Sequence, residues 1–412
     1  MKKTIALLVL AFCLNAKAQV VTNLAGCYSI GSSNGASTAA CFRNPMGVVA
    51  DNSGNLYIAD NDNNEIRKIV VATALVTSFS YGFYHPSGIT IDGSGNLYIA
   101  DAFNNEIRKL VIATGVLSTL AGSTTAGSAD GTGTAASFNR PQGIVYDGIG
   151  NLYVADLNNN MIRKIVISTG VVSTLAGNTT AGSLNGTGTT ASFHNPIAVA
   201  TDGLGNLYVS DYSNNEIRKI IISSGVVSTF AGSTTAGSTD STGTAASFSE
   251  PWGLVFDGSG NLYIVDSSNS KIRKISIANA KVTTFVTLGS MTGPTGIAID
   301  GSGNLYVTDI GDENILEITT NSAGINQISG LNTNISIYPN PSNGVFNLSI
   351  SQFDNLKTHS IEVYNTIGDC VHRQIAASAN CQIDLSDLAE GAYNILIQNS
   401  QFTSNKKVVI VR

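Results

Sequence analysis

Short apolar runs recur along the chain between residues 45 and 320, and clusters of Gly, Asn, Asp and Ser separate them. Residues 143–146, 151–155, 161–165 and 171–175 form one such series. Runs of this length that are rich in Val, Ile, Leu and Tyr are typical of β-strands. The Asp-Gly and Gly-Asn pairs between the first two runs tolerate the positive φ angles of tight hairpins. The series therefore predicts four consecutive antiparallel strands.

The four-strand series is repeated, and its most constant part reads Asp-Gly-Ser-Gly-Asn-Leu-Tyr-Ile-Ala-Asp at residues 92–101. Six copies begin at Asp51, Asp92, Asp147, Asp202, Asp257 and Asp300. A repeat of about 40–55 residues that contains strands and turns indicates a β-propeller with one blade per copy. Many of the expected strands are apolar on both faces, which suits blades that stack face to face. We therefore predict an all-β chain in which residues 19–320 form a six-bladed β-propeller.

The N-terminal strand is predicted to complete the last blade. No fourth strand follows the sixth copy, whereas residues 20–26 (Val-Val-Thr-Asn-Leu-Ala-Gly) match the fourth strand at 171–177 (Val-Val-Ser-Thr-Leu-Ala-Gly). A propeller closed in this way has no exposed strand edge at its seam, which lowers the risk of aggregation.

Most copies share a longer pattern, with Pro-x-Gly-[Ile/Val] before the Asp-Gly turn and Asn-Asn-x-Ile-Arg-Lys-Ile after the second strand. This pattern resembles the NHL repeat over residues 19–320. The sixth copy departs from it, because residues 309–314 and those that follow contain neither the Asn-Asn nor the Arg-Lys element. The resemblance implies a six-bladed propeller but no single activity, since the family includes binding modules, receptor sensor domains and lyases.

The composition changes after Thr320. Residues 321–333 are polar and are predicted to form a linker, and alternating runs in residues 334–412 predict a small antiparallel β-sandwich. This last region resembles the C-terminal sorting domain of the type IX secretion system in four segments: Tyr-Pro-Asn-Pro at 338–341, Ile-Glu-Val-Tyr-Asn at 361–365, Ile-Asp-Leu-Ser at 383–386 and Lys-Val-Val-Ile-Val at 407–411. The resemblance implies contact with the type IX secretion machinery and export across the outer membrane.

Residues 1–18 have the features of a secretory signal peptide, with two early lysines, an apolar run at 5–14 and a small-x-small segment at 16–18. The apolar run is too short to span a bilayer, and no other run is long enough to act as a transmembrane segment. We predict a mature chain that starts at Gln19 and is either secreted or held on the outer cell surface.

Charge and cysteine content bear on the class of partner and on the expected disulfides. Only 12% of the residues are charged and the formal net charge is −6, so a nucleic-acid partner, which needs a basic surface, is not expected.

Of the five cysteines, Cys13 lies in the predicted signal peptide. The four other cysteines form two local pairs, and an even number in a secreted chain favours disulfides between Cys27 and Cys41 and between Cys370 and Cys381. Four free thiols are the alternative.

Candidate binding residues come in the two positions before the proline that starts each blade, where the copies differ most, and Trp252 lies beside them, directly after its proline. We expect these loops to surround one mouth of the central channel, and we call the set the rim. A varied polar and aromatic ring on a uniform scaffold is a place for ligand specificity, whereas turn formation without a ligand is the alternative. The rim comprises Arg43, Asn44, Tyr84, His85, Asn139, Arg140, His194, Asn195, Glu250 and Trp252.

Catalytic chemistry has weaker support in the sequence. The propeller region has two histidines, too few for the zinc sites of NHL lyases, and we predict no metal, no cofactor and no catalytic residue. Glu250 and nearby asparagines keep a lactonase-like calcium site open. Asp60 and its equivalents are expected to cap turns, and Arg67 and its equivalents to pair with that aspartate or with carbonyl groups.

These observations favour a secreted or cell-surface binding or adhesion protein that recognises an extracellular glycan, peptide or protein. A secreted lyase or lactonase-like hydrolase with its site at the channel mouth is the alternative, so enzymatic activity stays open. Three nearly identical loops, at 121–138, 176–193 and 231–248, are less suited to a catalytic site, which needs distinct residues in distinct roles.

Overall fold

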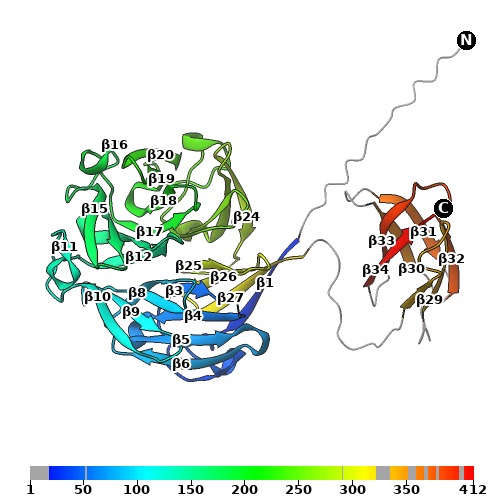
Figure 1. The fold of residues 1–412 in the computed structure, drawn as a ribbon, viewed down its shortest axis with the longest axis horizontal. Coiled ribbons are helices and arrows are strands. Elements are labelled where there is room, and N and C mark those ends of the chain that lie inside the picture. Colours follow the sequence, from blue (N-terminus) through cyan, green and yellow to red (C-terminus); the bar gives the residue numbers. More distant parts are fainter. Residues whose placement is uncertain are drawn as a thin grey trace, which may run out of the picture. The chain divides into compact units, whose positions relative to one another are not determined.

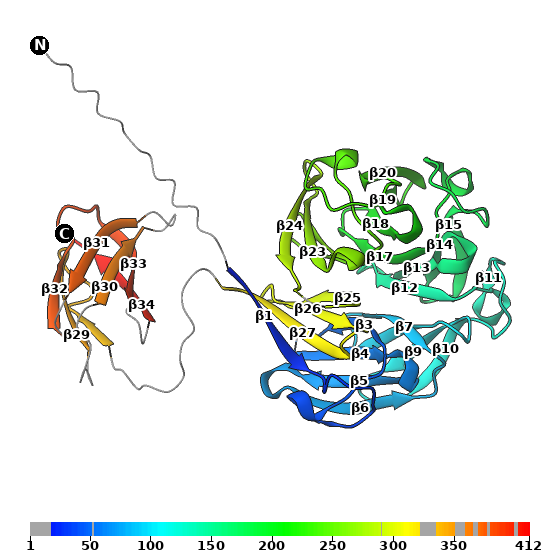
Figure 2. The same ribbon diagram turned by 180° about the vertical axis from the view of Figure 1, so that it is seen from behind.

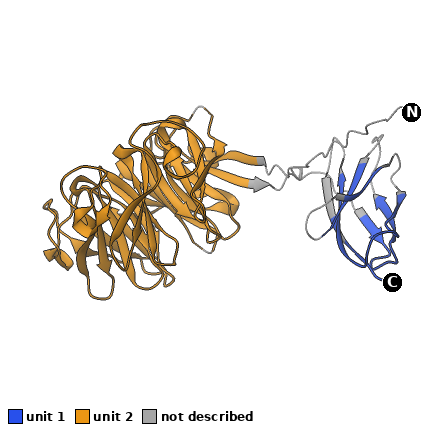
Figure 3. Cartoon of the chain, turned by 90° about the horizontal axis from the view of Figure 1, so that it is seen from above, with its two compact units in different colours: residues 1–18, 321–412 blue, residues 19–320 orange. Residues whose placement is uncertain are grey.

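The structure, a computed structural model, describes residues 18–51, 53–289, 291–321, 335–350, 359–365, 370–376, 380–398 and 403–412. The chain divides into two compact units, one of residues 19–320 and one that contains the residues after Thr320 (Figure 3). The predicted signal peptide, apart from Ala18, and nearly all of the predicted linker lie outside the described residues. Within the described ranges the only helices are short 3-10 turns, so the prediction of an all-β fold is confirmed.

Residues 19–320 form repeated antiparallel sheets, six of them in the described part of the unit (Figures 1 and 2). We number these sheets one to six in the chain order of their innermost strands. The innermost strands are β3 (Pro45–Ala50), β7 (Pro86–Ile91), β12 (Pro141–Tyr146), β17 (Pro196–Thr201), β21 (Pro251–Phe256) and β25 (Pro294–Ile299). The second strands are β4 (Asn55–Asp60), β8 (Asn96–Asp101), β13 (Asn151–Asp156), β18 (Asn206–Asp211), β22 (Asn261–Asp266) and β26 (Leu305–Asp309).

The third strands are β5 (Glu65–Val70), β9 (Glu106–Val111), β14 (Met161–Val166), β19 (Glu216–Ile221), β23 (Lys271–Ser276) and β27 (Asn314–Asn321). The outer strands are β6 (Leu75–Tyr81), β10 (Leu117–Gly122), β15 (Val171–Gly177), β20 (Val226–Gly232), β24 (Lys281–Thr287) and, in sheet six, β1 (Ala18–Ala25). The N-terminal strand therefore lies beside β27, at the other end of the unit's sequence.

Long loops into sheets one, three and four add a short strand to the outer edge of each sheet. These strands are β2 (Gly35–Ala36), β11 (Gly131–Thr132) and β16 (Gly186–Thr187), which pair with β6, β15 and β20. These loops contain the 3-10 turns η1 (Ser37–Ala39), η4 (Gly133–Ala135) and η6 (Gly188–Thr190), and the loop into sheet five contains η8 (Gly243–Ala245). The others are η2 (Asn61–Asn63), η3 (Val71–Thr73), η5 (Leu157–Asn159), η7 (Tyr212–Asn214) and η9 (Ser267–Asn269). The long loops thus cover outer edges that would otherwise be open to pairing.

Both faces of the repeated sheets are buried, as the apolar pattern predicts. Tyr98 and Ala100 of sheet two share a core cluster with Ile144 and Leu152 of sheet three. The opposite face of sheet three contributes Tyr153 to a cluster with sheet four. Burial on both sides explains why the second strands lack a polar face.

The innermost strands approach one another so closely that the third residue is glycine in five of the six, the exception being Ala198 of β17. A Cβ atom on Gly88 would lie 2.2 Å from the carbonyl oxygen of Gln142, and one on Gly296 would lie 2.1 Å from that of Met46. This explains the glycine of the Pro-x-Gly element. Each innermost strand contacts those before and after it, and β25 contacts β3.

The described residues from Ile335 onward form two antiparallel sheets around one core. One sheet contains β28 (Ile335–Tyr338), β29 (Val345–Ile350) and β32 (Asn380–Asp384). The other contains β30 (His359–Tyr364), β31 (Cys370–Ala376), β33 (Gly391–Gln398) and β34 (Thr403–Ile410). Phe346 and Ile383 of the first sheet pack with Ile361 and Ile395 of the second, which is the arrangement of a β-sandwich.

The predicted disulfide between Cys370 and Cys381 is wrong, because Cys381 is a free thiol. Cys370 lies opposite Tyr364 in one sheet, whereas Cys381 lies opposite Leu348 in the other. Cys381 packs against the apolar core of the unit. Closeness in sequence therefore does not bring the two cysteines together, since the chain changes sheets between them.

Candidate ligand-binding rim

The residue before the first proline of a sheet has a positive φ angle in five of the six sheets. These residues are Asn44 (φ 52°), His85 (54°), Arg140 (57°), Asn195 (53°) and Glu250 (53°), and Gly293 takes the position in sheet six. A left-handed backbone is uncommon for residues other than glycine. Its repetition here shows that the sharp entrance into each innermost strand belongs to the scaffold and holds these rim positions in the same way.

Side chains of the preceding sheet hold the same five residues in place. Each of their backbone N–H groups donates to a side-chain oxygen located four residues after the second strand's final aspartate, and we call these bonds the rim staples. The pairs are Asn44 with Glu313 (2.6 Å), His85 with Asn64 (2.8 Å), Arg140 with Asn105 (2.8 Å), Asn195 with Asn160 (2.9 Å) and Glu250 with Asn215 (2.9 Å). The rim staples therefore join neighbouring sheets next to the candidate binding residues.

The aspartate at the end of each second strand organises the turn beneath the rim. Asp60 Oδ1 accepts a hydrogen bond from the N–H of Arg43 (2.8 Å), and Oδ2 accepts one from Asn63 Nδ2 (2.9 Å). The predicted capping role is thus confirmed. Burial raises the pKa of Asp60 to about 6, although these hydrogen bonds and the nearby Arg67 act in the opposite direction.

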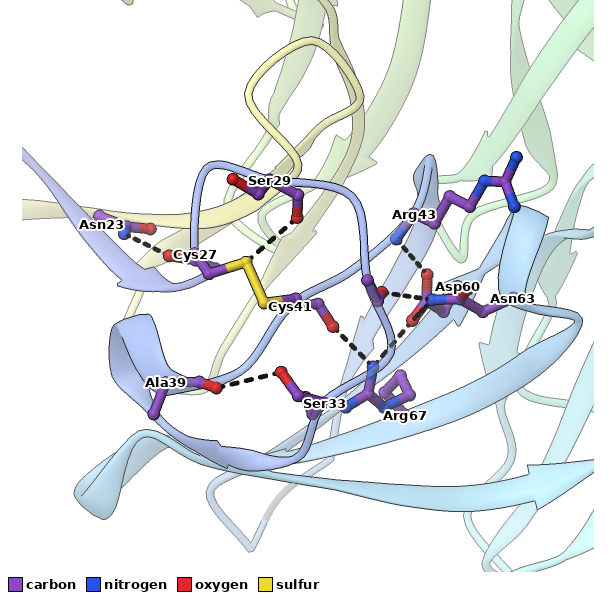
Figure 4. Close-up of a disulfide and its surroundings, with 12 residues drawn as sticks. Asn23, Cys27, Ser29, Ser33, Ala39, Cys41, Arg43, Asp60, Asn63 and Arg67 are labelled. Carbon is purple, nitrogen blue, oxygen red and sulfur yellow. Dashed lines mark hydrogen bonds and ion pairs between the residues drawn. A yellow bond between two sulfur atoms is a disulfide. The ribbon is translucent and has the colours of Figure 1, made fainter.

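A buried arginine clamps the aspartate to the loop that leads into the sheet (Figure 4). Arg67 Nη1 donates to Asp60 Oδ2 and to the carbonyl oxygen of Cys41, both at 2.9 Å. Its Nη2 donates to Ser33 O and Asn34 Oδ1, also at 2.9 Å. The same arrangement recurs at Arg163, Arg218 and Arg273. The recurring arginine is therefore structural, as predicted.

The disulfide between Cys27 and Cys41 is confirmed, and it closes the loop that Arg67 holds (Figure 4). Cys27 follows β1, which belongs to sheet six, whereas Cys41 precedes the first strand of sheet one. The bond therefore connects the N-terminal strand covalently to the sheet that follows it around the unit.

Four rim and turn residues form an aromatic and cationic cluster over sheets two and three. The ring centroid of Phe103 lies 4.5 Å from that of His85 and 5.5 Å from that of Tyr84. The Arg140 guanidinium lies 5.1 Å from the Phe103 centroid on a cation–π contact. Tyr84 and Phe103 are 49% and 45% exposed. This cluster presents apolar surface and an arginine for which the described residues supply no ion-pair partner.

The ring of His85 also lies beside an acidic side chain. His85 Nδ1 lies 3.0 Å from Asp62 Oδ1 and 3.0 Å from Asn61 Oδ1. Asp62 also accepts a 2.6 Å hydrogen bond from Asn44 Nδ2 and lies 3.6 Å from Arg43 Nε. A carboxylate beside Nδ1 fixes the orientation of the imidazole ring and leaves Nε2 as the nitrogen that is available for a ligand or a proton.

A second aromatic and acidic group lies over sheets four and five. The rings of Tyr212 and Trp252 pack edge to face at 5.4 Å, and Ser268 donates a 2.6 Å hydrogen bond to Glu250. Burial, together with its hydrogen bond to Glu250, raises the pKa of Tyr212 to about 12. The other rim residues make simpler contacts: Asn158 donates to Asn139 (3.2 Å), Ser213 donates to Asn195 (3.0 Å), and the carbonyl of His194 accepts from Ser213 N–H.

A cavity of about 270 Å³ is lined by all six innermost strands. Of the ten rim residues, Trp252 lines it, and aliphatic residues such as Val48, Ile144 and Leu254 form much of its wall. Sequence reasoning missed Asp62, Phe103, Tyr212 and their equivalents as partners of the rim. Their signal was available, because they occupy the variable positions immediately after the constant aspartate.

The residues that the structure describes contain no group of three or more His, Cys, Asp or Glu residues placed to hold a metal ion. No helix among them has the length and apolar character of a membrane span.

Comparison with known families identifies both parts of the chain. The NHL repeat matches residues 42–69 and 248–275, and the secretion system C-terminal sorting domain matches residues 336–411. The chain is 30% identical over 161 residues to the Arabidopsis thaliana chloroplastic protein SUPPRESSOR OF QUENCHING 1, and 29% identical over 161 residues to human NHL repeat-containing protein 2. These matches cover 37% and 36% of this chain but only 15% and 22% of the relatives.

Solved structures share the fold at low sequence identity. A protein of unknown function from Bacteroides thetaiotaomicron has a TM-score of 0.61 and 21% identity, over 73% of this chain and 76% of that one. An auxiliary nutrient binding protein from the same organism has a TM-score of 0.59 and 15% identity, over 74% and 76%. A gluconolactonase from Xanthomonas campestris has a TM-score of 0.54 and 13% identity, over 73% and 89%. The chain therefore contains NHL repeats in a β-propeller unit and ends in a type IX secretion C-terminal sorting domain.

Proposed function

We propose that residues 19–320 are a closed six-bladed β-propeller that binds an extracellular ligand at its rim. In this proposal β1 completes the last blade, residues 1–18 are a signal peptide, and residues 321–333 link the propeller to the sorting domain of residues 334–412. Two contacts support closure: β1 shares a sheet with β27, and β25 contacts β3. The sorting domain supports a location that is secreted or on the cell surface.

The observation that carries the binding proposal is the cluster of Tyr84, Phe103 and Arg140. At the positions of Tyr84 and Phe103, the other sheets have polar or small residues such as Asn139 and Ser213. Half-exposed aromatic rings beside an arginine that has no ion-pair partner among the described residues offer apolar contact area and a planar donor. Aromatic side chains and arginine are enriched where binding energy concentrates. The scaffold fixes both ends of this cluster, because rim staples hold His85 and Arg140.

A glycan array and a peptide array, probed with the purified chain, test this proposal. Phe103→Ala and Arg140→Ala should each lower binding to any ligand that the wild type retains, by about tenfold or more, since central interface residues contribute about 2 kcal/mol. Lys109→Ala, which removes a charge from the third strand of sheet two, is the matched control. Retained ligands whose binding is equal in all four proteins would place the ligand site elsewhere.

A secreted hydrolase or lyase is the second candidate, and the contact between His85 and Asp62 favours it. A histidine oriented by a carboxylate can act as a general base through its other nitrogen. Turnover of a lactone or glycan substrate that His85→Gln abolishes, while binding persists, would select this candidate. Loss of binding without any turnover in the wild type would select the binding protein.

A further inference from the structure

Sheet six lacks the arginine clamp of the other sheets. Leu316 lies opposite Val307 in sheet six, at the position where Arg163 lies opposite Val154 in sheet three. The aspartate of the clamp is nevertheless present, as Asp309. Sheet six also has Asp312 where sheet three has Asn159, so two donors to the carboxylate have been replaced.

The carboxylate of Asp309 is consequently left with an unpaired oxygen. Its Oδ1 accepts hydrogen bonds from three backbone N–H groups, at 2.8 to 3.3 Å. Its Oδ2 is buried and has no hydrogen-bond partner, and the residue is fully buried. In sheet three, by contrast, Asp156 Oδ2 accepts from Asn159 at 2.8 Å and from Arg163 at 2.9 Å.

Asn314 presents a second buried, unpaired oxygen at the same end of sheet six. It lies directly opposite Asp309 in the ladder between β26 and β27, and facing residues of paired strands point to the same side of a sheet. Its Oδ1 has no hydrogen-bond partner, and the residue is 1% exposed.

Asn23 of β1 supplies a third such oxygen, since its Oδ1 is buried and unpaired. A Cβ atom on Gly26 would lie 2.6 Å from Asn314 Cα, as one on Gly177 would lie 3.1 Å from Met161 Cα. Asn23, three residues before Gly26, therefore takes the place of Thr174, which lies opposite Arg163 in sheet three. We call Asn23, Asp309 and Asn314 the seam site.

The seam site has acceptors but no cation. Elsewhere, the carboxylates of Glu65 and Glu216 also have an unpaired oxygen, yet they lie 3.8 and 3.6 Å from an arginine Nε. No described Lys, Arg or His forms an ion pair with Asp309. Buried acceptors without a donor are costly, and a buried carboxylate without a positive charge more so.

We propose that the seam site binds Ca²⁺ in the volume that a guanidinium fills in the other sheets. One carboxylate and two amide oxygens are hard ligands, and Ca²⁺ accepts such mixed oxygen sets in irregular geometry with water completing the shell. Leucine is shorter than arginine and carries no donor, so it leaves that position uncharged. The ion would connect β1 to the β26–β27 hairpin. This site differs from the sequence-based expectation of no metal and does not depend on what the rim binds.

Thermal unfolding of the purified chain in EDTA, in 10 mM MgCl₂ and in 10 mM CaCl₂ tests the proposal. Weak extracellular sites have Kd values of about 0.1–1 mM, so calcium should raise the Tm by a few degrees. Asp309→Asn should remove the calcium response. Leu316→Arg, which restores the residue of the other five sheets, should raise the Tm in EDTA and also remove the response.

Three other outcomes would contradict the proposed calcium site. An unchanged Tm in calcium would mean that a water molecule or a direct bond between the side chains satisfies the oxygens. An equal response in wild type and Asp309→Asn would place the calcium elsewhere. An equal response to magnesium would show that the ion acts without selecting for the seam site's geometry. Asp257→Asn, in a surface turn of sheet five, is the matched control and should keep the full response.

Discussion

The carboxylate of Glu313 accepts a 2.6 Å hydrogen bond from the backbone N–H of Asn44, although the two residues are 269 positions apart. It occupies the place of the asparagine amides that staple the other sheets, and it joins the last hairpin of the repeated unit to its first sheet. Because the acceptor is ionisable, this bond is the charge-assisted member of the set.

Glu313→Ala should lower the free energy of unfolding by about 1.5–3 kcal/mol, the usual range for a hydrogen bond to a charged group. Asn105→Ala removes the neutral staple to Arg140 and should cost about 1 kcal/mol. Both residues have φ angles near +54°, so the backbone effect of alanine cancels in the comparison. Urea unfolding measures both, and an equal loss would show that the charge adds nothing at the seam.

Removing the disulfide between Cys27 and Cys41 should also lower the free energy of unfolding, because it joins the same two sheets, six and one. Replacing Cys27 and Cys41 by serine frees a loop whose ends are 14 residues apart, for which the chain-entropy model gives about 3 kcal/mol. The wild type in reducing agent should lose a similar amount. A reduced protein that is as stable as the oxidised one in urea would mean that Arg67 alone fixes this loop.

The free thiol of Cys381 gives a direct test of the C-terminal unit. An alkylating reagent added to the denatured, unreduced protein should label both Cys370 and Cys381 but neither Cys27 nor Cys41. Intact mass then reports two adducts on a chain that lacks its signal peptide. Zero adducts would restore the disulfide that the sequence suggested.

The repeats made most of this architecture predictable from the sequence. The features that could not be predicted depend on which strands and sheets meet in the fold. The Asp-Gly turns, the double apolar faces and the arginine clamps follow from local chemistry that most of the six copies repeat. The pairing of Cys370 with Cys381 failed because strand order, not spacing, decides which segments meet. The variable position of Phe103 is visible in the sequence, but its contact with Arg140 joins two neighbouring sheets and leaves no periodic signal that would pair the two residues.

The clamp in sheet three can be tested by removing one or both partners. Arg163→Met should cost about 3–5 kcal/mol, because it leaves Asp156 buried without its cation. The double variant Arg163→Met, Asp156→Asn should recover part of this loss, since no buried charge remains. Additive losses in urea unfolding would show that the charges do not interact, contrary to their 2.9 Å contact.

Glu216 should make stability depend on pH. Burial raises its pKa from the ordinary 4.5 to about 7, with Asp211 adding to the rise and Arg218 opposing it. Between these values the folded protein holds a proton that the unfolded chain releases, so the free energy of unfolding falls as pH rises from about 4.5 to about 7. Glu216→Gln should flatten that decline and stabilise the protein above pH 7. Glu106→Gln, at the equivalent but more exposed position of sheet two, is the matched control, and an identical pH profile in all three proteins would contradict the assignment.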